Sequence, residues 1–183
     1  WEGLSDTKFH SASYWGRACG WYFLALVDIL AEMDKANLSS NSKYLTDYTR
    51  IKGYLTDLAA GLKAKQDANT GGWYQILDKD GKFSASVYDN GKSHTATANY
   101  IESSATAIFA AAYLKAIRLG YLSKADYGET ATNAYKCIVN NFFAKDGEGV
   151  HIFGSCRSAG LGSDKTDGTW ARGKANFRDG SNA

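Results

Sequence analysis

The feature that most constrains this chain is a seven-residue motif in which two glycines and an arginine lie between two tryptophans, Trp15-Gly16-Arg17-Ala18-Cys19-Gly20-Trp21. An apolar run over residues 22–30 follows, and a helix that is apolar nearly all round is buried on every side. The run therefore predicts an inner helix over about 18–35. At its start, the arginine offers a planar fork of donors suited to carboxylates. Tryptophan faces offer flat apolar surfaces on which a sugar can stack.

The motif has a second interpretation, in which its tryptophans belong to the core and Arg17 is a structural ion-pair partner. Spacing alone does not separate the two. The composition is compatible with both, because five Trp, twelve Tyr and eight Phe among 183 residues fit a carbohydrate site or a large core. A chain of this length can bury such a core as one domain.

Charge and cysteine content restrict the function classes. Lys and Arg number 21 against 19 Asp and Glu, and this net charge of +2 argues against a nucleic-acid-binding surface. The three cysteines, Cys19, Cys137 and Cys156, form no C-x-x-C pair. Neither a zinc site nor a redox motif is indicated, and we expect free, mostly buried thiols. No apolar run approaches the length of a membrane span.

Hydrophobic periodicity predicts three more helices. Apolar side chains at three- and four-residue steps indicate an amphipathic outer helix over 42–66. An alanine-rich helix runs from 101 or 102 to 119 and is stopped by Gly120 at the C′ position. Ser123 then resembles the cap of a fourth helix that reaches about Phe143.

Residues 67–99 are not helical. Turn signals at 79–82 and 89–92 flank a candidate short strand over 83–88. A further turn is expected over 145–149, and the tail from Val150 has no helical period. Loops as long as the first region are usually functional in a compact domain.

This order of elements predicts an all-α fold of helical hairpins, each with one inner and one outer helix. Short turns join the helices at one end, and long aromatic loops join the hairpins at the other. About six such hairpins close into an (α/α) toroid. Two hairpins and the start of a third would expose the apolar flanks of the inner helices, which is unusual in a soluble monomer. We therefore expect residues 1–183 to be one domain that is part of a larger barrel.

Six motifs of the chain, taken together and in order, resemble one enzyme family. They are residues 15–21, 70–78, 99–107 and 120–122, Cys156 with 159–162, and 178–181. The resemblance is to the C-terminal half of glycoside hydrolase family 105, the unsaturated rhamnogalacturonyl hydrolases, with family 88, the unsaturated glucuronyl hydrolases, as a more distant relative. It covers nearly the whole chain and implies an (α/α)6 toroid, here truncated at both ends, with the active site at the mouth formed by the long loops.

The resemblance also implies a substrate and a mechanism. The substrate is an oligosaccharide from pectin that ends in a 4,5-unsaturated uronic acid linked to rhamnose. An Asp protonates the C4=C5 double bond and helps water to add at C5, and the resulting hemiketal opens and expels the rest of the sugar chain. The two-carboxylate scheme of other glycosidases does not apply. No metal or organic cofactor is implied.

Five residues match family positions at this mouth. Arg17 and Trp21 correspond to the arginine and tryptophan that bind and flank the unsaturated uronate. Trp73 and Gln75 lie in the matching Trp-Tyr-Gln loop, and Glu102 lies at the start of the next inner helix. For these last three residues, pocket lining and structural support remain equal alternatives, since Glu102 could simply cap backbone amides.

The chain also departs from the family pattern. The catalytic Asp of the family lies upstream of the matching motif, so no catalytic residue is assigned here: Asp6 is too close to Arg17, and Asp28 lies inside the inner helix. The family usually has Arg-Gly where this chain has Arg17-Ala18, and residues 79–97 form a longer insertion. His10 is a further pocket candidate, with an exposed loop histidine as the alternative.

Two hypotheses follow. In the first, the parent protein is a hydrolase, and these 183 residues carry its binding wall but are inactive alone. In the second, the chain is a non-catalytic carbohydrate-binding or structural (α/α) domain, or an inactive fragment. The partners expected are the unsaturated oligosaccharide and the missing N-terminal half of the same protein, with no nucleic acid and no membrane. The compartment stays open between the cytoplasm and the periplasm or secretion.

Overall fold

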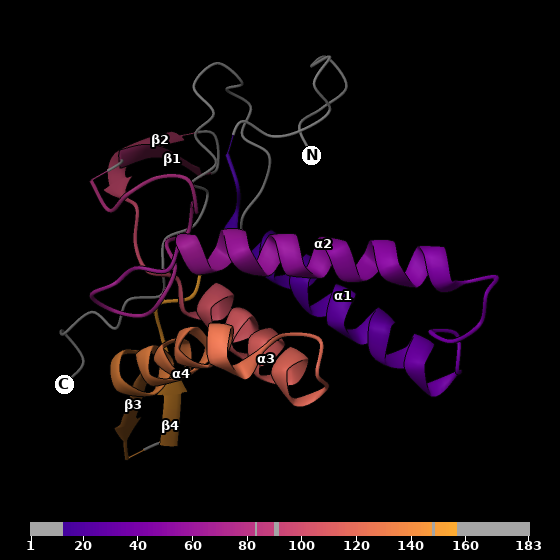
Figure 1. Cartoon of the computed structure of the whole chain (residues 1–183). Helices are drawn as coiled ribbons and strands as arrows, with labels where there is room; N and C mark the ends of the chain where they lie inside the picture. Colours follow the sequence, from indigo (N-terminus) through magenta and orange to yellow (C-terminus); the bar gives the residue numbers. More distant parts are fainter. Residues whose placement is uncertain (1–12, 83, 90–91, 148, 157–183) are drawn as a thin grey trace.

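The computed structural model describes residues 13–82, 84–89, 92–147 and 149–156 (Figure 1). Its helices are α1 (Gly16–Lys35), α2 (Leu45–Ala64), α3 (Ser103–Arg118) and α4 (Lys124–Asn141). Two antiparallel hairpins join β1 (Ser84–Asp89) to β2 (Lys92–Ala98) and β3 (Phe143–Asp146) to β4 (Gly149–Ile152). The predicted all-α class is confirmed, because both β-hairpins are small additions to the helices. In the described part of the chain, no helix has the length and apolarity needed to cross a membrane.

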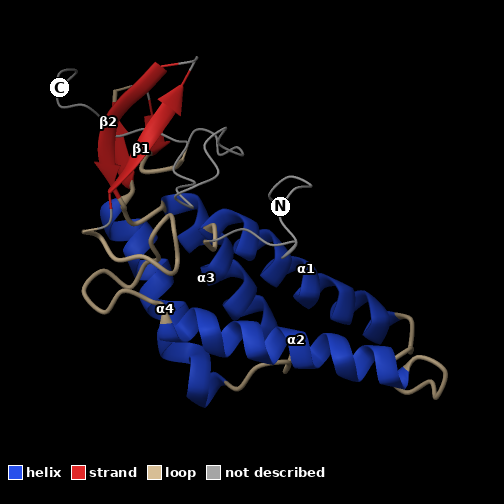
Figure 2. Cartoon of the chain, turned by 90° about the horizontal axis from the view of Figure 1, so that it is seen from above, coloured by secondary structure: helices blue, strands red, loops and turns tan. Residues whose placement is uncertain are grey.

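The helices form two hairpins, α1 with α2 and α3 with α4. The first helices of the two hairpins also pack on each other, so α1 contacts both α2 and α3. The turns within the hairpins lie at one end of the molecule, and the long loops with β1 and β2 lie at the other (Figures 1 and 2). Because α1 and α3 run in the same direction, the N-termini of both inner helices meet at the long-loop end. This is the arrangement that the sequence predicted.

Trp73, in the loop after α2, lies at the centre of the core. Its side chain is fully buried and packs edge-on against Phe109, with ring centroids 5.0 Å apart, and in a stacked arrangement against Tyr113 at 6.3 Å. The indole Nε1 donates to the Leu62 carbonyl at 2.8 Å. Because α2 and α3 both hold this ring, the loop that follows α2 is fixed to the helices at the mouth.

The predicted helix ends agree closely with the observed ones. Ser123 caps α4 by accepting from the Asp126 amide, and Gly120 follows α3 with φ of +78°. The candidate strand over 83–88 is β1, and its partner β2 was not expected. The turn expected over 145–149 joins β3 to β4, with Asp146 paired to Gly149.

One expectation about α1 was wrong, because this helix is buried along one stripe and not on every side. Phe23, Val27 and Leu30 are fully buried, whereas Trp21 is 60% exposed and Ile29 is 45% exposed. The described part of the chain supplies α2 and α3 as neighbours of α1 and leaves its other face uncovered. Such exposed apolar flanks are what the sequence predicted for part of a ring of hairpins.

Gly72 allows the loop after α2 to approach α4 closely. A Cβ atom at this position would lie 2.5 Å from Cγ2 of Ile101 and 2.9 Å from Sγ of Cys137. We therefore expect Gly72→Ala to lower the free energy of unfolding by about 1–3 kcal/mol, as overpacking does. Gly61, inside α2, is the matched control, since a Cβ there would contact nothing within 4 Å. Gly61→Ala should raise stability by about 0.5–1 kcal/mol, and equal effects in urea denaturation would contradict this packing.

Asp34, near the end of α1, accepts hydrogen bonds from the hydroxyls of Tyr121 at 2.5 Å and Tyr48 at 3.4 Å. The Tyr121 hydrogen bond lowers the pKa of this carboxyl. A carboxyl whose pKa is lowered by folding stabilises the protein above its unfolded-state pKa, and that stability is lost as the pH falls through the folded-state pKa.

We therefore expect Tyr121→Phe to cost about 1 kcal/mol of unfolding free energy at neutral pH, with a smaller cost in acid. Denaturation of both proteins across the acid range measures this difference. Tyr48→Phe is the control, and it should have a smaller effect because its hydrogen bond is longer. A cost for Tyr121→Phe that is independent of pH would rule out the link to Asp34.

Candidate functional site

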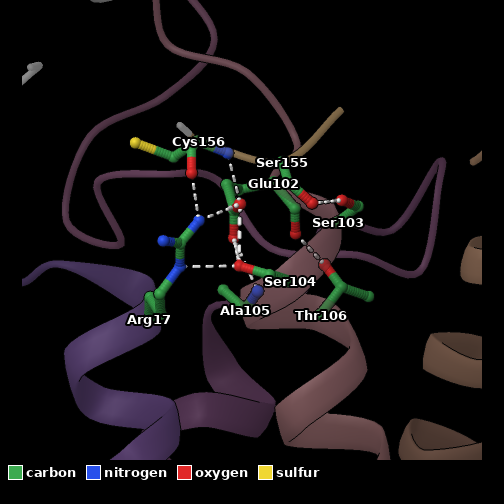
Figure 3. Close-up of polar contacts among 8 residues, drawn as sticks. All are labelled: Arg17, Glu102, Ser103, Ser104, Ala105, Thr106, Ser155 and Cys156. Atoms are coloured by element: carbon green, nitrogen blue, oxygen red, sulfur yellow. Dashed lines mark hydrogen bonds and ion pairs between the residues drawn. The ribbon is translucent and has the colours of Figure 1, made fainter. Parts of the chain in front are cut away.

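Arg17 lies in the first turn of α1, where the N-terminus of this helix meets that of α3. Its Nε donates to Oγ of Ser104 at 2.7 Å, and its Nη2 donates to Oε1 of Glu102 at 3.2 Å and to the Cys156 carbonyl (Figure 3). The chain therefore brings together two of the five predicted residues, Arg17 and Glu102. The side chain of Arg17 is 20% exposed.

Glu102 is the N-cap of α3, and its side chain is fully buried. One carboxylate oxygen accepts from the Ala105 amide at 2.5 Å, and the other accepts from the Cys156 amide at 2.7 Å. The hydroxyl of Ser104 lies 2.9 Å from both oxygens. Both carboxylate oxygens are therefore fully engaged by donors at the start of the helix. Glu102 is thus both a helix cap and the ionic partner of Arg17.

The segment after β4 completes this group of contacts, the Arg17 cluster, which consists of Arg17, Glu102, Ser103, Ser104, Ser155 and Cys156. The Ser103 amide donates to the Gly154 carbonyl at 3.1 Å, and the hydroxyls of Ser103 and Ser155 are 2.6 Å apart. Both backbone groups of Cys156 are used, the amide by Glu102 and the carbonyl by Arg17. Three separate parts of the chain are therefore needed to hold the guanidinium in place.

One edge of the guanidinium stays available. Arg17 has five N–H donors, and its Nη1 has no partner among the described residues. Figure 3 shows this nitrogen on the side of the guanidinium away from Glu102. Because Nη2 is already bound to Glu102 and Cys156, Arg17 can offer an anionic ligand one nitrogen and not the two-nitrogen fork. The carboxylate of Glu102 also offsets much of the charge of Arg17.

Aromatic side chains flank Arg17 at the start of α1. Its guanidinium carbon lies 5.7 Å from the centre of the Trp15 ring, which is within the range of a cation–π interaction. Trp21 follows one helical turn later, so it lies on the same side of the helix. Its 60% exposure leaves an indole face open for stacking.

Gln75 and Trp15 carry buried polar atoms for which the described residues supply no partner. Both side-chain amide atoms of Gln75 and the indole Nε1 of Trp15 make no hydrogen bond within this part of the chain. The backbone of Gln75 is engaged, since it accepts from the Gly16 amide at 2.9 Å and donates to the Tyr100 carbonyl at 2.8 Å. Buried polar groups without partners are rare and are associated with function or with bound water, so the pocket-lining alternative for Gln75 stays open.

Trp73, by contrast, is fully buried in the core and its indole nitrogen is satisfied by Leu62. Its position supports the structural alternative for this residue. Asp28, which the sequence placed inside the inner helix, pairs on the surface with Lys115 of α3 at 2.6 Å. Asp6, His10, residues 159–162 and residues 178–181 lie outside the described part of the chain.

Tyr100 adds a phenol to the cluster. Burial raises the pKa of its hydroxyl well above the ordinary value, and the neighbouring Cys156, which hydrogen-bonds to it, raises this pKa further. Tyr100 therefore stays protonated across the physiological range. Burial likewise raises the pKa of the Cys19 and Cys137 thiols, and no disulfide joins the three cysteines.

Sequence reasoning missed Ser104, Ser155 and Cys156 as members of the cluster. A signal existed for Ser104, because it follows Glu102 by two residues at a predicted helix start. Cys156 belonged to one of the six motifs, but nothing in that motif indicated that its backbone amide and carbonyl would bind Glu102 and Arg17. Within the described part, no group of three or more His, Cys, Asp or Glu side chains could hold a metal ion.

Comparison with known proteins extends this description. Residues 3–172 match the sequence profile of Glycosyl Hydrolase Family 88. Protein Atu3128 of Agrobacterium fabrum is 32% identical over 182 residues, which cover 97% of this chain and 66% of that protein. The 24.9 kDa protein in the picA locus of Rhizobium radiobacter gives the same values. The chain thus spans less than two thirds of the length of these relatives.

Two solved structures share the fold. A family 105 glycoside hydrolase from C. acetobutylicum has a TM-score of 0.67 at 31% identity, over 93% of this chain and 41% of that one. A possible member of the GH105 family from Salmonella enterica has a TM-score of 0.64 at 26% identity, over 88% and 35%. Sequence and structure therefore both match the resemblance that the six motifs indicated.

Proposed function

Because the chain belongs to Glycosyl Hydrolase Family 88, we propose that it supplies the binding wall of a hydrolase that acts on oligosaccharides ending in an unsaturated uronic acid. The free Nη1 edge of Arg17 carries this proposal. It lies at the N-termini of two inner helices, where the helix dipoles favour an anion, and the exposed face of Trp21 is on the same side of α1. A uronate needs both features, a donor for its carboxylate and a surface for its ring.

The substrate we propose is an unsaturated galacturonyl-rhamnose unit from rhamnogalacturonan. Arg17 binds the uronate carboxylate through Nη1 alone, while Glu102, Ser104 and the Cys156 carbonyl hold the guanidinium in position. Because Glu102 offsets much of the charge of Arg17, this contact acts chiefly as an oriented hydrogen bond. Trp21 stacks on the sugar ring, and Trp73 supports the wall from the core without touching the sugar.

The proposed reaction is hydration of the double bond. A proton is added at C4, water adds its oxygen at C5 and releases its own proton, and the hemiketal then opens and releases the neighbouring sugar. Glu102 is unsuited to be the acid, because its side chain is fully buried and its oxygens are engaged by Arg17, Ser104 and two backbone amides. We assign the acid to an Asp in the upstream half of the parent protein. We also expect that upstream half to cover the exposed face of α1.

The absorbance of the conjugated alkene tests this proposal. The parent protein should remove the absorbance of an unsaturated rhamnogalacturonan disaccharide, and the 183 residues alone should not. If the parent protein leaves the absorbance unchanged, it is not such a hydrolase.

The fully engaged state of Glu102 also favours a second candidate, a non-catalytic carbohydrate-binding domain. That candidate predicts saturable binding of the disaccharide to the parent protein, measured by calorimetry, without loss of absorbance. Binding together with loss of absorbance would exclude it.

A further inference from the structure

A polar cleft of about 380 Å³ lies outside the Arg17 cluster, between the loop after α2 and the C-terminal half of α4. Its described lining residues are Gln66, Asp67, Ala68, Asn69, Thr70, Gly71, Asn133, Lys136, Cys137, Asn140 and Asn141. Five of these are side-chain carboxamides. None of them is aromatic, and the two charged residues have opposite signs.

The cleft has a defined shape, because hydrogen bonds within the loop after α2 hold one of its walls in place. The Asp67 amide donates to the Gly72 carbonyl at 2.9 Å, and the Gly71 amide donates to the Asp67 carbonyl at 2.8 Å. One Asp67 carboxylate oxygen accepts from both the amide and the hydroxyl of Thr70, at 2.9 and 2.8 Å. These bonds leave the loop little freedom to close the space.

The same loop is also fixed to α4. Nε2 of Gln66 donates to the Gly71 carbonyl at 2.7 Å and to the Thr130 carbonyl at 2.9 Å. Gly71 has φ of +75°, and a Cβ there would lie 2.8 Å from the Asn133 carbonyl oxygen. A larger residue at this position would force the loop away from the helix, so the glycine sets the width of the cleft.

The hydrogen bonds that build the cleft leave oxygen acceptors free. Both partners of the Gln66 amide are carbonyls, so the NH₂ group must face them, and Oε1 is left without a partner among the described residues. Nδ2 of Asn141 donates to the Cys137 carbonyl at 3.0 Å, which leaves its Oδ1 free in the same way. The second carboxylate oxygen of Asp67 also has no partner among the described residues.

Donors come from the opposite wall. The side chains of Lys136 and Asn140 are exposed, and neither makes a hydrogen bond or ion pair within the described part of the chain. The cleft therefore offers fixed acceptors and adjustable donors with no net charge. An anion would lie beside Asp67, and a cation would lie beside Lys136, so neither ion suits the cleft.

We propose that this cleft binds a neutral saccharide, distinct from the uronate site at Arg17. Sugar hydroxyls both donate and accept hydrogen bonds. Carboxamides match them, because they present acceptor oxygens beside donor N–H groups. Without an aromatic platform, the ring is held by its edges and affinity is modest. The site would hold neutral sugar units of a longer chain, outside the mouth.

Side-chain amide signals in ¹⁵N–¹H NMR spectra of the protein test this site. L-Rhamnose and D-galactose are the probes. We expect saturable shifts of the Asn133 and Asn140 carboxamide signals with at least one of these sugars. Lys136→Ala and Asn140→Ala should each weaken binding about tenfold, the loss of a good hydrogen bond. Lys124→Ala, at the exposed start of the same helix, should leave binding unchanged.

Several outcomes would overturn the proposal. One is the absence of saturable shifts with both sugars, and another is binding that neither variant weakens. Shifts of the same signals with inorganic phosphate or Ca²⁺ but not with sugar would mark an ion site instead. The readout is binding alone, so failure of the alkene assay would leave this result unaffected, and failure here would leave the hydrolase proposal standing.

Discussion

Replacing Glu102 by Ala is expected to lower the free energy of unfolding by about 3–5 kcal/mol, the usual cost of breaking a buried ion pair. The change removes the cap of α3 at the Ala105 amide and the acceptor of the Cys156 amide, and it leaves Arg17 without its carboxylate. Each buried donor left unpaired costs about 1–3 kcal/mol. Urea denaturation, monitored by tryptophan fluorescence, measures the total.

Ser123→Ala is the matched control for the capping part of this effect. Ser123 caps α4 through one hydrogen bond to the Asp126 amide and has no part in the Arg17 cluster. Its loss should cost about 1 kcal/mol. If Glu102→Ala costs no more than Ser123→Ala, Glu102 is a cap alone and the buried network adds nothing.

Replacing Arg17 by Ala is expected to lower kcat/KM of the parent protein on the unsaturated disaccharide by about 10- to 100-fold. A hydrogen bond to a charged group contributes about 1.5–3 kcal/mol, and each 1.4 kcal/mol is a factor of ten. The stacking position of the sugar on Trp21 is lost with it. Since Ala also leaves Glu102 buried without its ionic partner, folding of the variant must be checked at the assay temperature.

Two variants make this result specific. Arg17→Lys keeps the charge but lacks the planar fork, so the lysine cannot bind Ser104, Glu102 and a ligand together. Its kcat/KM should therefore fall almost as far as that of Arg17→Ala. Lys115→Ala removes another cation that joins α1 to α3, but its pair with Asp28 is on the surface and contributes about 0–1 kcal/mol. Its activity should be unchanged. An Arg17→Ala protein that is folded and fully active would remove Arg17 from the substrate site.

The positions of Arg17 and Glu102 show how far sequence reasoning reached. Each was placed at the start of an inner helix, and the alternation of inner and outer helices predicted that these starts would share one end. Their direct contact joins residues 85 positions apart, so it required the packing of α1 on α3. The sequence could not identify the Cys156 carbonyl as a partner of Arg17, because every residue has a carbonyl and only the folded structure shows which one lies beside the guanidinium.

Burial was the harder quantity to predict. Trp73 and Trp21 both belong to motifs at the mouth, yet one is fully buried and the other is 60% exposed. The distinction depends on which side of each backbone faces α2 and α3, and composition does not carry that information. The same limit explains the error about α1, whose apolar residues are buried only where a neighbouring helix is present.

The Arg17 cluster also has a consequence for the order of folding. The bond from Arg17 to the Cys156 carbonyl spans 139 positions, so it closes a loop that contains almost all of the described chain. Contacts of long sequence separation form slowly, because loop-closure entropy opposes them until nearer contacts are made. We therefore expect the helical hairpins to form first and this cluster last. A chain paused in a partly folded state would then have helices but no competent site, which ties the appearance of binding to the completion of the fold.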